Sequence, residues 1–323
     1  MRRVTLVLAT GLLFMVVLSG IASAAIINAK LGHVGAPDHI FEIGAQKFAE
    51  LVKEKTGGTV LVQSFPGGQL GGDRDMMESL QMGTLELAIE GPIDSFVPMA
   101  SIIPLPYMWK SPEHVYKFLD SPLSDRVYAD LDKMGIVRLA NMENGWRLVT
   151  SNKPIEKISD FVGFKIRTPE SPMFRDTFIA FGASPVPIPF PELYSALQQG
   201  VVDGQENPIF HIMTQKFYEV QKYLAMTRHM YLDAPLLASK IFWNKLSADQ
   251  QKALKEAAIE ATRYQRQVAI EMEEDLLHQI QEFGVKITNP NLEELAAAVQ
   301  PLHQAWAEKY GKDYYQQMVD LAQ

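Results

Sequence analysis

The sequence predicts an α/β protein of two lobes with mainly parallel sheets and a long helix that spans both lobes. Its 323 residues, 47% of them hydrophobic, suffice for about two domains with cores of their own. Strand-like and helix-like segments alternate from residue 26 to residue 90, as in a parallel sheet. No helix breaker occurs from Ala248 to Phe283, and such a helix spans roughly 54 Å, which exceeds one lobe.

Composition excludes several classes of function. The net charge of −8 argues against nucleic acid or an anionic membrane as a partner. The absence of cysteine excludes disulfides and thiolate metal sites, and the seven histidines show no metal-ligand spacing. The chain also lacks His-Glu-x-x-His, Gly-x-Ser-x-Gly and a phosphate-binding loop. We therefore expect a protein that is not an enzyme, with no catalytic residues, cofactor or metal.

The first 24 residues have the pattern of a signal peptide. Arg2 and Arg3 precede an apolar run over residues 4–21, and small residues at positions 22–24 provide a cleavage site after Ala24. A retained membrane anchor is the alternative, because the apolar run is just long enough to span a bilayer. The small residues directly after the run favour cleavage, and hence a soluble periplasmic protein.

The elements of the first lobe follow from apolar periodicity and from turn residues. We expect Asp38 to cap its first helix. Ligands of such sheets bind beyond the carboxyl ends of the strands, where Glu90 stands, while His39 opens the first helix. Both are candidate ligand contacts, with a local hydrogen-bonding role as the alternative for each. The predicted elements are strands over 26–32, 59–65 and 85–89, and helices over 39–55 and 74–82.

The second lobe is expected to begin near residue 145. Three prolines within 184–190 exclude an interior strand, because each removes a ladder donor, and they suit an extended edge segment beside a cleft. Phe190 at the end of this segment either stacks on a ligand ring or packs in the core. The other expected elements are a strand over 136–141, short helices from 112 and 122, a strand over 164–167, helices over 171–181 and 191–199, and a strand over 223–227. The apolar segment 231–242 is expected to return to the first lobe, and residues 285–287 with helices from 292 to the end complete the second lobe.

Three polar positions at strand ends suit a carboxylate ligand. Arg147 and Arg167 offer planar forks that match a carboxylate with two parallel hydrogen bonds, and Asn207 adds a neutral donor. From the residues alone, a structural ion pair to a nearby acidic side chain is an equal alternative for Arg167.

The segment Asp-Gly-Gln-Glu-Asn-Pro at 203–208, followed by Gln-Lys-Phe-Tyr-Glu-Val-Gln-Lys-Tyr at 215–223, resembles the solute-binding subunits of TRAP (tripartite ATP-independent periplasmic) transporters. The resemblance covers the chain after the leader. It implies a periplasmic protein whose lobes comprise 25–144 with 233–272, and 145–232 with 273–323. It also implies that Arg167 holds the ligand carboxylate, with Arg147 and Asn207 beside it. Whether Arg147 bonds to the ligand or orients its neighbours stays open.

The resemblance further implies that the lobes close on an organic acid and that the closed form docks on the small and large membrane subunits. We expect a monomer. Glu90 and Glu170 would repel a second carboxylate and accept hydrogen bonds from hydroxyls, which favours a sugar acid such as a uronate or aldonate.

The chain is similar to sialic-acid-binding members at four of these positions. It differs from them at Val34 and Ile93, where they carry polar contacts, and at Glu170, where they have asparagine. The alternatives are a C4-dicarboxylate or sialic acid as the ligand, a binding protein that serves a sensor, and a periplasmic enzyme acting on a carboxylated sugar.

Overall fold

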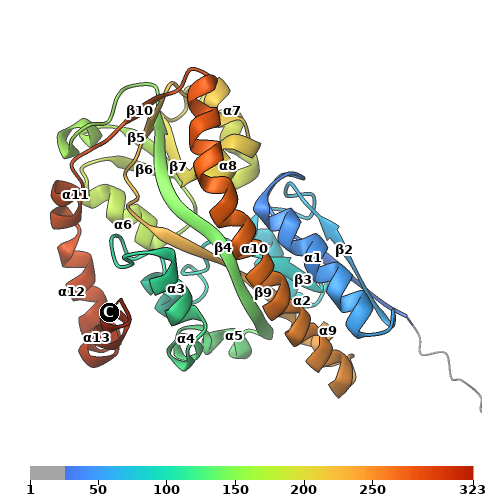
Figure 1. Cartoon of the computed structure of the whole chain (residues 1–323). Coiled ribbons are helices and arrows are strands. Elements are labelled where there is room, and N and C mark those ends of the chain that lie inside the picture. The colour runs from blue at the N-terminus through green and yellow to red at the C-terminus, as the bar shows by residue number, and fades with distance from the viewer. Residues whose placement is uncertain (1–25, 323) are drawn as a thin grey trace, which may run out of the picture.

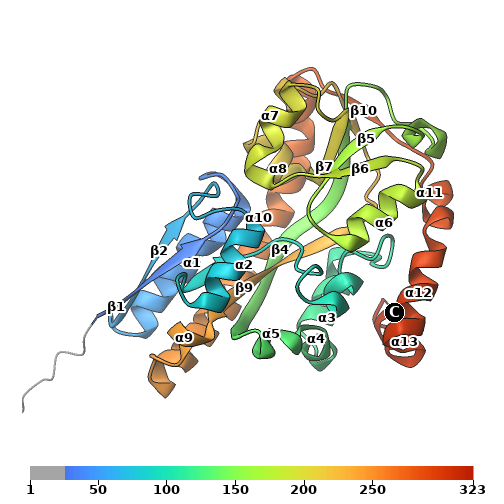
Figure 2. The ribbon, with the colours of Figure 1, turned by 180° about the vertical axis from the view of Figure 1, so that it is seen from behind.

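A computed structural model describes residues 26–322 of the chain. The predicted signal peptide, residues 1–24, lies outside the described residues. Within the described part, no helix is both long enough and apolar enough to cross a membrane. The described residues form two lobes, which Figure 1 shows from the front and Figure 2 from behind.

The first lobe is built on three parallel strands, with β1 between β2 and β3. The predicted strand–helix alternation is confirmed, and α1 packs on β2. His39, not Asp38, caps α1: its Nδ1 accepts a hydrogen bond from the backbone nitrogen of Phe41 at 3.0 Å. The elements are β1 (Ile27–Gly32), α1 (Ile40–Lys55), β2 (Val60–Phe65), α2 (Asp73–Met82) and β3 (Leu87–Ile89).

The second lobe also has a parallel set of strands, β7, β5 and β6. The proline-containing strand β6 lies at the edge of the sheet, as predicted, because only an edge tolerates the lost donors. The elements are β5 (Lys165–Thr168), α6 (Pro172–Ala180), β6 (Ser184–Pro187), α7 (Leu193–Gln198), β7 (Gly204–Pro208), α8 (Ile209–Thr214), β8 (Tyr223–Ala225) and β10 (Lys286–Thr288), with 3₁₀ turns at Ile158–Phe161, Phe190–Glu192 and Phe217–Glu219.

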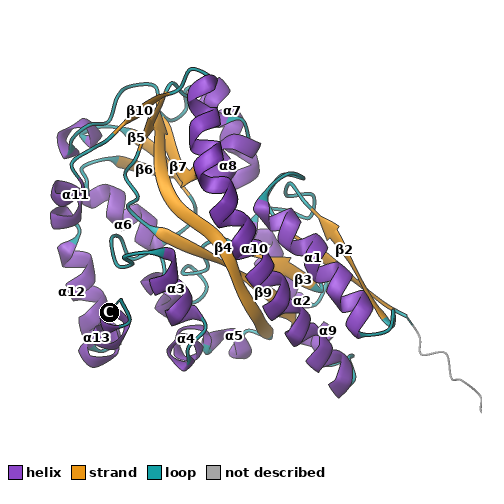
Figure 3. Ribbon diagram, in the orientation of Figure 1, coloured by secondary structure: helices purple, strands orange, loops and turns teal. Residues whose placement is uncertain are grey.

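One long strand, β4 (Ile136–Ser151), belongs to the sheets of both lobes (Figure 3). Residues 136–146 pair antiparallel with β9 (Tyr231–Ser239), and residues 147–151 pair antiparallel with β7. The β4–β9 register shifts twice, the second time between Glu143 and Gly145, where Gly145 has a φ of 112° that favours glycine. The parallel core of each lobe is thus joined to antiparallel partners, so the complete sheet is mixed.

Helix α10 (Ala248–Glu282) contacts α1 and β4 and also α8 of the second lobe, which confirms the predicted long helix that spans both lobes. It begins at a capping box formed by Ser247 and Gln250. Midway, the side chain of Gln265 bonds to both the backbone nitrogen and the carbonyl oxygen of Glu143, at 2.8 and 2.9 Å. The helix is therefore fixed to β4 next to the register shift.

The C-terminal helices pack against α3 and α4, as Figures 1 and 2 both show. His114 of α3 hydrogen-bonds to the carbonyl oxygen of Met318 at 2.8 Å, and Trp306 donates to Ser101 at 3.0 Å. These contacts join segments that the predicted division assigns to different lobes. The remaining elements are a 3₁₀ turn at Pro98–Ile102, α3 (Pro112–Leu119), α4 (Pro122–Tyr128), α5 (Asp130–Lys133), α9 (Lys240–Trp243), α11 (Leu292–Ala298), α12 (Gln300–Tyr310) and α13 (Lys312–Asp320).

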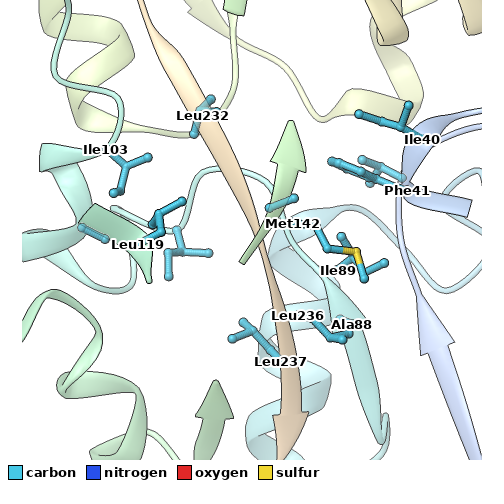
Figure 4. Close-up of a cluster of buried hydrophobic side chains, with 14 of the residues drawn as sticks. Ile40, Phe41, Ala88, Ile89, Ile103, Leu119, Met142, Leu232, Leu236 and Leu237 are labelled. Carbon is cyan, nitrogen blue, oxygen red and sulfur yellow. The ribbon is translucent and has the colours of Figure 1, made fainter. Parts of the chain in front are cut away.

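The core of the first lobe lies on both sides of β9, because successive side chains of a strand point to opposite faces. In Figure 4, Leu237 lies on the side of Leu119, and Leu236 lies on the side of Ala88 and Ile89. All nine residues of β9 are buried. This strand positions β3, and through it the loop that follows Ile89 at the edge of the site.

Candidate functional site

Arg167 is buried at 2% exposure on β5, yet no carboxylate of residues 26–322 lies within ion-pair distance of it. Its Nε donates to the carbonyl oxygen of Ile188 at 2.8 Å, and its guanidinium lies 5.7 Å from the ring centre of Phe190. Burial lowers the pKa of Arg167 to about 10, so the group is still charged at neutral pH. The terminal nitrogens of the fork are thereby left for a ligand anion.

Arg147 on β4 has a different environment, because Glu206 of β7 holds it. Its Nε and Nη2 donate to the carboxylate of Glu206, and Nη2 also donates to the Glu206 carbonyl oxygen at 2.8 Å. Both side chains are buried. Burial alone raises the pKa of Glu206, but Arg147 and His229 outweigh it and lower that pKa below its ordinary value. The pair is internally neutral, whereas Arg167 forms no ion pair with any described residue.

Asn207 lies between these groups. Its Oδ1 accepts from Nη2 of Arg147 at 2.9 Å, and its Nδ2 donates to Oε1 of Gln205 at 2.5 Å. The antiparallel register of β4 and β7 sets this arrangement, because it places Leu148 opposite Asn207 and Arg147 opposite Pro208. Asn207 is therefore held in a fixed orientation beside the two arginines.

Two adjoining cavities lie between the lobes at this point. The outer one, about 230 Å³, lies between α2 and the β5–β6 side of the second lobe, and Asp73, Arg167, Glu170 and Phe190 line it. The inner one is about 20 Å³, and its lining adds Asn144, Arg147, Asn207 and His211. Arg167, Asp73 and Phe190 line both cavities, so the structure brings the predicted Arg147, Arg167, Asn207, Glu170 and Phe190 together.

Asp73, the first residue of α2, is the acidic group that faces Arg167 from the other lobe. Its Oδ1 accepts from the backbone nitrogen of Gly91 at 3.1 Å. Burial raises the pKa of Asp73, while Gly91, Arg167 and Arg147 act in the opposite direction. No sequence pattern singles out Asp73 as a site residue, because an aspartate at a helix start is ordinarily part of the cap.

Glu90 is fully buried, and neither carboxylate oxygen has a hydrogen-bond partner within the described chain. Burial, and then the nearby charge of Asp73, raise the pKa of Glu90 well above its ordinary value. The carboxyl group therefore keeps its proton to a higher pH than an exposed glutamate does, whereas the sequence-based expectation was of a charged group. It lines neither cavity, so its role as a ligand contact stays a prediction.

His39 is also buried and lines neither cavity. Its ring stacks on that of His211 from α8 with a centroid distance of 4.0 Å, and Phe190 lies 4.8 Å from His211. Burial lowers the pKa of both His39 and His211, so both rings are neutral at pH 7. The capping and stacking of His39 are local structural contacts, and its contact with a ligand stays a prediction.

The two lobes touch around the cavities. Arg74 of α2 and Glu170 form an exposed ion pair at 3.2 Å, and Asp94 accepts from the Ser171 hydroxyl at 2.8 Å. The turn before α2 approaches so closely that a Cβ on Gly68 would lie 3.2 Å from Pro191. The arrangement is a closed one, in which side chains of both lobes surround the space beside Arg167.

Residues 31–310 match the family model described as bacterial extracellular solute-binding protein, family 7. The chain belongs to this family, whose members include the periplasmic solute-binding proteins of TRAP transporters. The family resemblance inferred from residues 203–223 is therefore confirmed.

Relatives that are similar over most of their length carry different ligands. The 2,3-diketo-L-gulonate-binding periplasmic protein of Escherichia coli is 34% identical over 269 residues, which is 82% of each chain. A TRAP periplasmic solute-binding protein of Polaromonas bound to D-erythronate is 35% identical, with a TM-score of 0.88 over 91% of this chain and 98% of that one. One of Sulfurospirillum deleyianum with bound succinate is also 35% identical, with a TM-score of 0.85 and the same shares covered.

Proposed function

We propose that this chain is the periplasmic solute-binding subunit of a TRAP transporter and that it captures a sugar acid, a hydroxylated monocarboxylate of the aldonate or uronate type. The observation that carries the proposal is the buried Arg167, which is charged and has no carboxylate partner within residues 26–322. A ligand carboxylate at its terminal nitrogens would supply the missing partner through two charge-assisted hydrogen bonds. Such bonds contribute most of the roughly 8 kcal/mol of micromolar binding.

The acidic groups of the outer cavity favour hydroxyls at the far end of the ligand. Asp73 and Glu170 line that cavity together with Arg167. A second ligand carboxylate near Asp73 would be repelled, whereas a hydroxyl would donate a hydrogen bond to it. We attribute the preference for hydroxyls to Asp73 and Glu170 rather than to Glu90, because Glu90 lines neither cavity and its pKa is raised. The relatives that bind 2,3-diketo-L-gulonate and D-erythronate agree with this ligand class.

Lobe closure provides the mechanism of capture. Arg167 comes from the second lobe and Asp73 from the first, so a ligand that contacts both stabilises the closed form. The closed form then docks on the small and large membrane subunits, and the chain acts as a monomer without catalysis. Recovery of the bound ligand chemically unchanged separates this role from that of an enzyme acting on a carboxylated sugar.

The experiment is isothermal titration with D-gluconate, D-glucuronate, sialic acid and succinate. We expect binding of an aldonate or uronate, with succinate at least about tenfold weaker. The matched variant Asp73→Asn is expected to weaken sugar-acid binding and to reduce the discrimination against succinate. Binding of succinate alone by the wild-type protein would overturn the sugar-acid assignment in favour of a C4-dicarboxylate, the class represented by the succinate-bound relative.

A further inference from the structure

Another cavity, with a polar lining, lies outside the ligand cleft. It shares no lining residue with the two cavities beside Arg167. It measures about 270 Å³, which exceeds the roughly 30 Å³ that one water molecule occupies in the liquid. Three elements form it, namely the end of α3, the first half of β4 and one face of α10. Its charged and polar lining residues are Asp120, Arg138, Asn141, Lys255, Thr262, Arg263 and Arg266.

Four of these lining residues are cations and one is an acid, in a chain whose net charge is −8. The α10 residues Lys255, Ile259, Thr262 and Arg266 recur about once per turn, so they share the face that looks toward β4. Arg263 lies one residue beyond Thr262 and also lines the cavity. The spacing of a helix therefore concentrates positive charge along one side of this cavity.

Two of the guanidinium groups are held in place before any ligand arrives. Arg138 donates to Ser124 and Asn141, pairs with Asp125 at 2.5 Å, and lies 4.5 Å over the ring of Tyr128. Arg138 is thus fixed, and its one acidic partner, Asp125, lies outside the cavity lining. Preorganised cations lose little conformational entropy when an anion binds.

Arg266 is fixed in a similar way on the opposite wall. It pairs with Asp120 at 2.8 Å, donates to the carbonyl oxygen of Asn141 at 2.7 Å, and lies 4.3 Å over the ring of Tyr116. Its Nε has no hydrogen-bond partner within residues 26–322, and neither does Oγ1 of Thr262 one turn earlier. Asp120 is the one carboxylate in the lining, and it is 64% exposed.

Lys255 and Arg263 carry positive charge without a carboxylate partner. Nζ of Lys255 donates to the carbonyl oxygen of Arg138 at 3.2 Å, where β4 shifts register, and Arg263 makes no ion pair with any described residue. Burial and the nearby Arg138 lower the pKa of Lys255, the direction expected where cations crowd together. An anion in the cavity would relieve this repulsion.

We propose that this cavity, between α3, β4 and α10, binds a small multiply charged oxyanion such as inorganic phosphate. The oxyanion would contact Lys255 and Arg263 on the helix and Arg138 on the strand, and so link α10 to β4. The site is independent of the proposed capture of a sugar acid, because no residue is common to the two.

The test is isothermal titration of the full protein with inorganic phosphate, at an ionic strength balanced with chloride. We expect saturable binding that the double variant Lys255→Gln/Arg263→Gln weakens by about tenfold or more, because each lost charged hydrogen bond contributes that much. Both side chains lie on the exposed part of α10, so the variant should fold. Arg167→Gln should bind phosphate like the wild type, because its cavity is a separate one.

The matched control is Lys252→Gln, which removes one positive charge from an exposed position of the same helix outside the cavity. It is expected to leave phosphate binding unchanged. Equal weakening in this control, or no binding beyond that seen with chloride, would overturn the proposal. So would loss of phosphate binding in Arg167→Gln with full binding in the double variant, because the anion would then occupy the ligand cleft.

Discussion

The substitution Arg147→Met separates a positioning role of this arginine from direct ligand binding. Arg147 makes three hydrogen bonds to Glu206, two to its carboxylate and one to its carbonyl oxygen, and the carboxylate is fully buried. Removal of one partner from a buried ion pair leaves the other charge uncompensated, which costs about 3–5 kcal/mol of stability. We therefore expect Arg147→Met to lower the free energy of unfolding by that amount, measured by urea unfolding without ligand.

Two further variants sharpen this measurement. In Arg147→Met/Glu206→Gln the stranded charge is absent, so at least half of the lost stability should return. Arg175→Met, at an exposed position of α6, is the control and should unfold like the wild type. The double variant should also retain weak sugar-acid binding through Arg167, because Arg147 is engaged by the protein.

The pH dependence gives an independent check with a fixed sign. In the wild type the pKa of Glu206 is below its ordinary value, so the pair stabilises the fold above pH 4.5 and the contribution is lost as the pH falls through the lowered pKa. In Arg147→Met the carboxylate of Glu206 is isolated and takes up a proton more readily. The difference in unfolding free energy between this variant and the wild type should therefore shrink as the pH is lowered toward 4.5. The reasoning would be refuted if the free energy of unfolding of Arg147→Met lay within about 1 kcal/mol of the wild-type value. It would also be refuted if Arg147→Met/Glu206→Gln were less stable than Arg147→Met.

Two other predictions concern Glu143 of β4 and Glu170 of the outer cavity. Burial raises the pKa of Glu143 to about 7 although Tyr116 and Tyr231 donate to it, so the folded protein holds a proton that the unfolded chain has lost above about pH 4.5. Stability should therefore fall by about 2 kcal/mol as the pH rises from 5 to 7, and Glu143→Gln should remove this slope in urea titrations; an identical slope in the variant would show that another group causes it. Glu170→Gln removes a carboxylate that lines the outer cavity and pairs with Arg74, so sugar-acid affinity in isothermal titration should fall by about tenfold, because a charged acceptor for a ligand hydroxyl is lost. A change of less than about twofold would show that Glu170 serves only its exposed pair with Arg74.

Much of the fold could be predicted because its signals are local. Apolar periodicity and turn residues located the strands and helices of the first lobe, and the absence of any breaker after Ser247 predicted α10. The prolines of β6 predicted its position at the edge of the sheet, because proline has no backbone N–H to donate to a neighbouring strand. The packing of α12 and α13 on α3 and α4 could not be predicted, because side chains about 200 residues apart carry it, as in the His114–Met318 hydrogen bond.

The types of residue in the candidate site could be predicted from the sequence, but the contacts between their side chains could not. Arg167 stands at a predicted strand end, and the family resemblance implied its contact with the ligand carboxylate, so both its position and its chemistry could be predicted. The engagement of Arg147 by Glu206 depends on the β4–β7 register, which joins segments 59 residues apart. Asp73 was missed because its facing partner lies on the other lobe. The raised pKa of Glu90 follows from burial, which no local sequence pattern records.

Isothermal titration of Arg167→Gln with the sugar acid that binds the wild-type protein is the most direct test of the central claim. Loss of the two charge-assisted hydrogen bonds should weaken binding by at least about a hundredfold. The urea midpoint without ligand should not fall, because Arg167 has no acidic partner within residues 26–322 whose charge would be left unpaired. An unchanged dissociation constant, together with an unchanged thermal shift on adding ligand, would contradict the assignment of Arg167 as the carboxylate-binding residue.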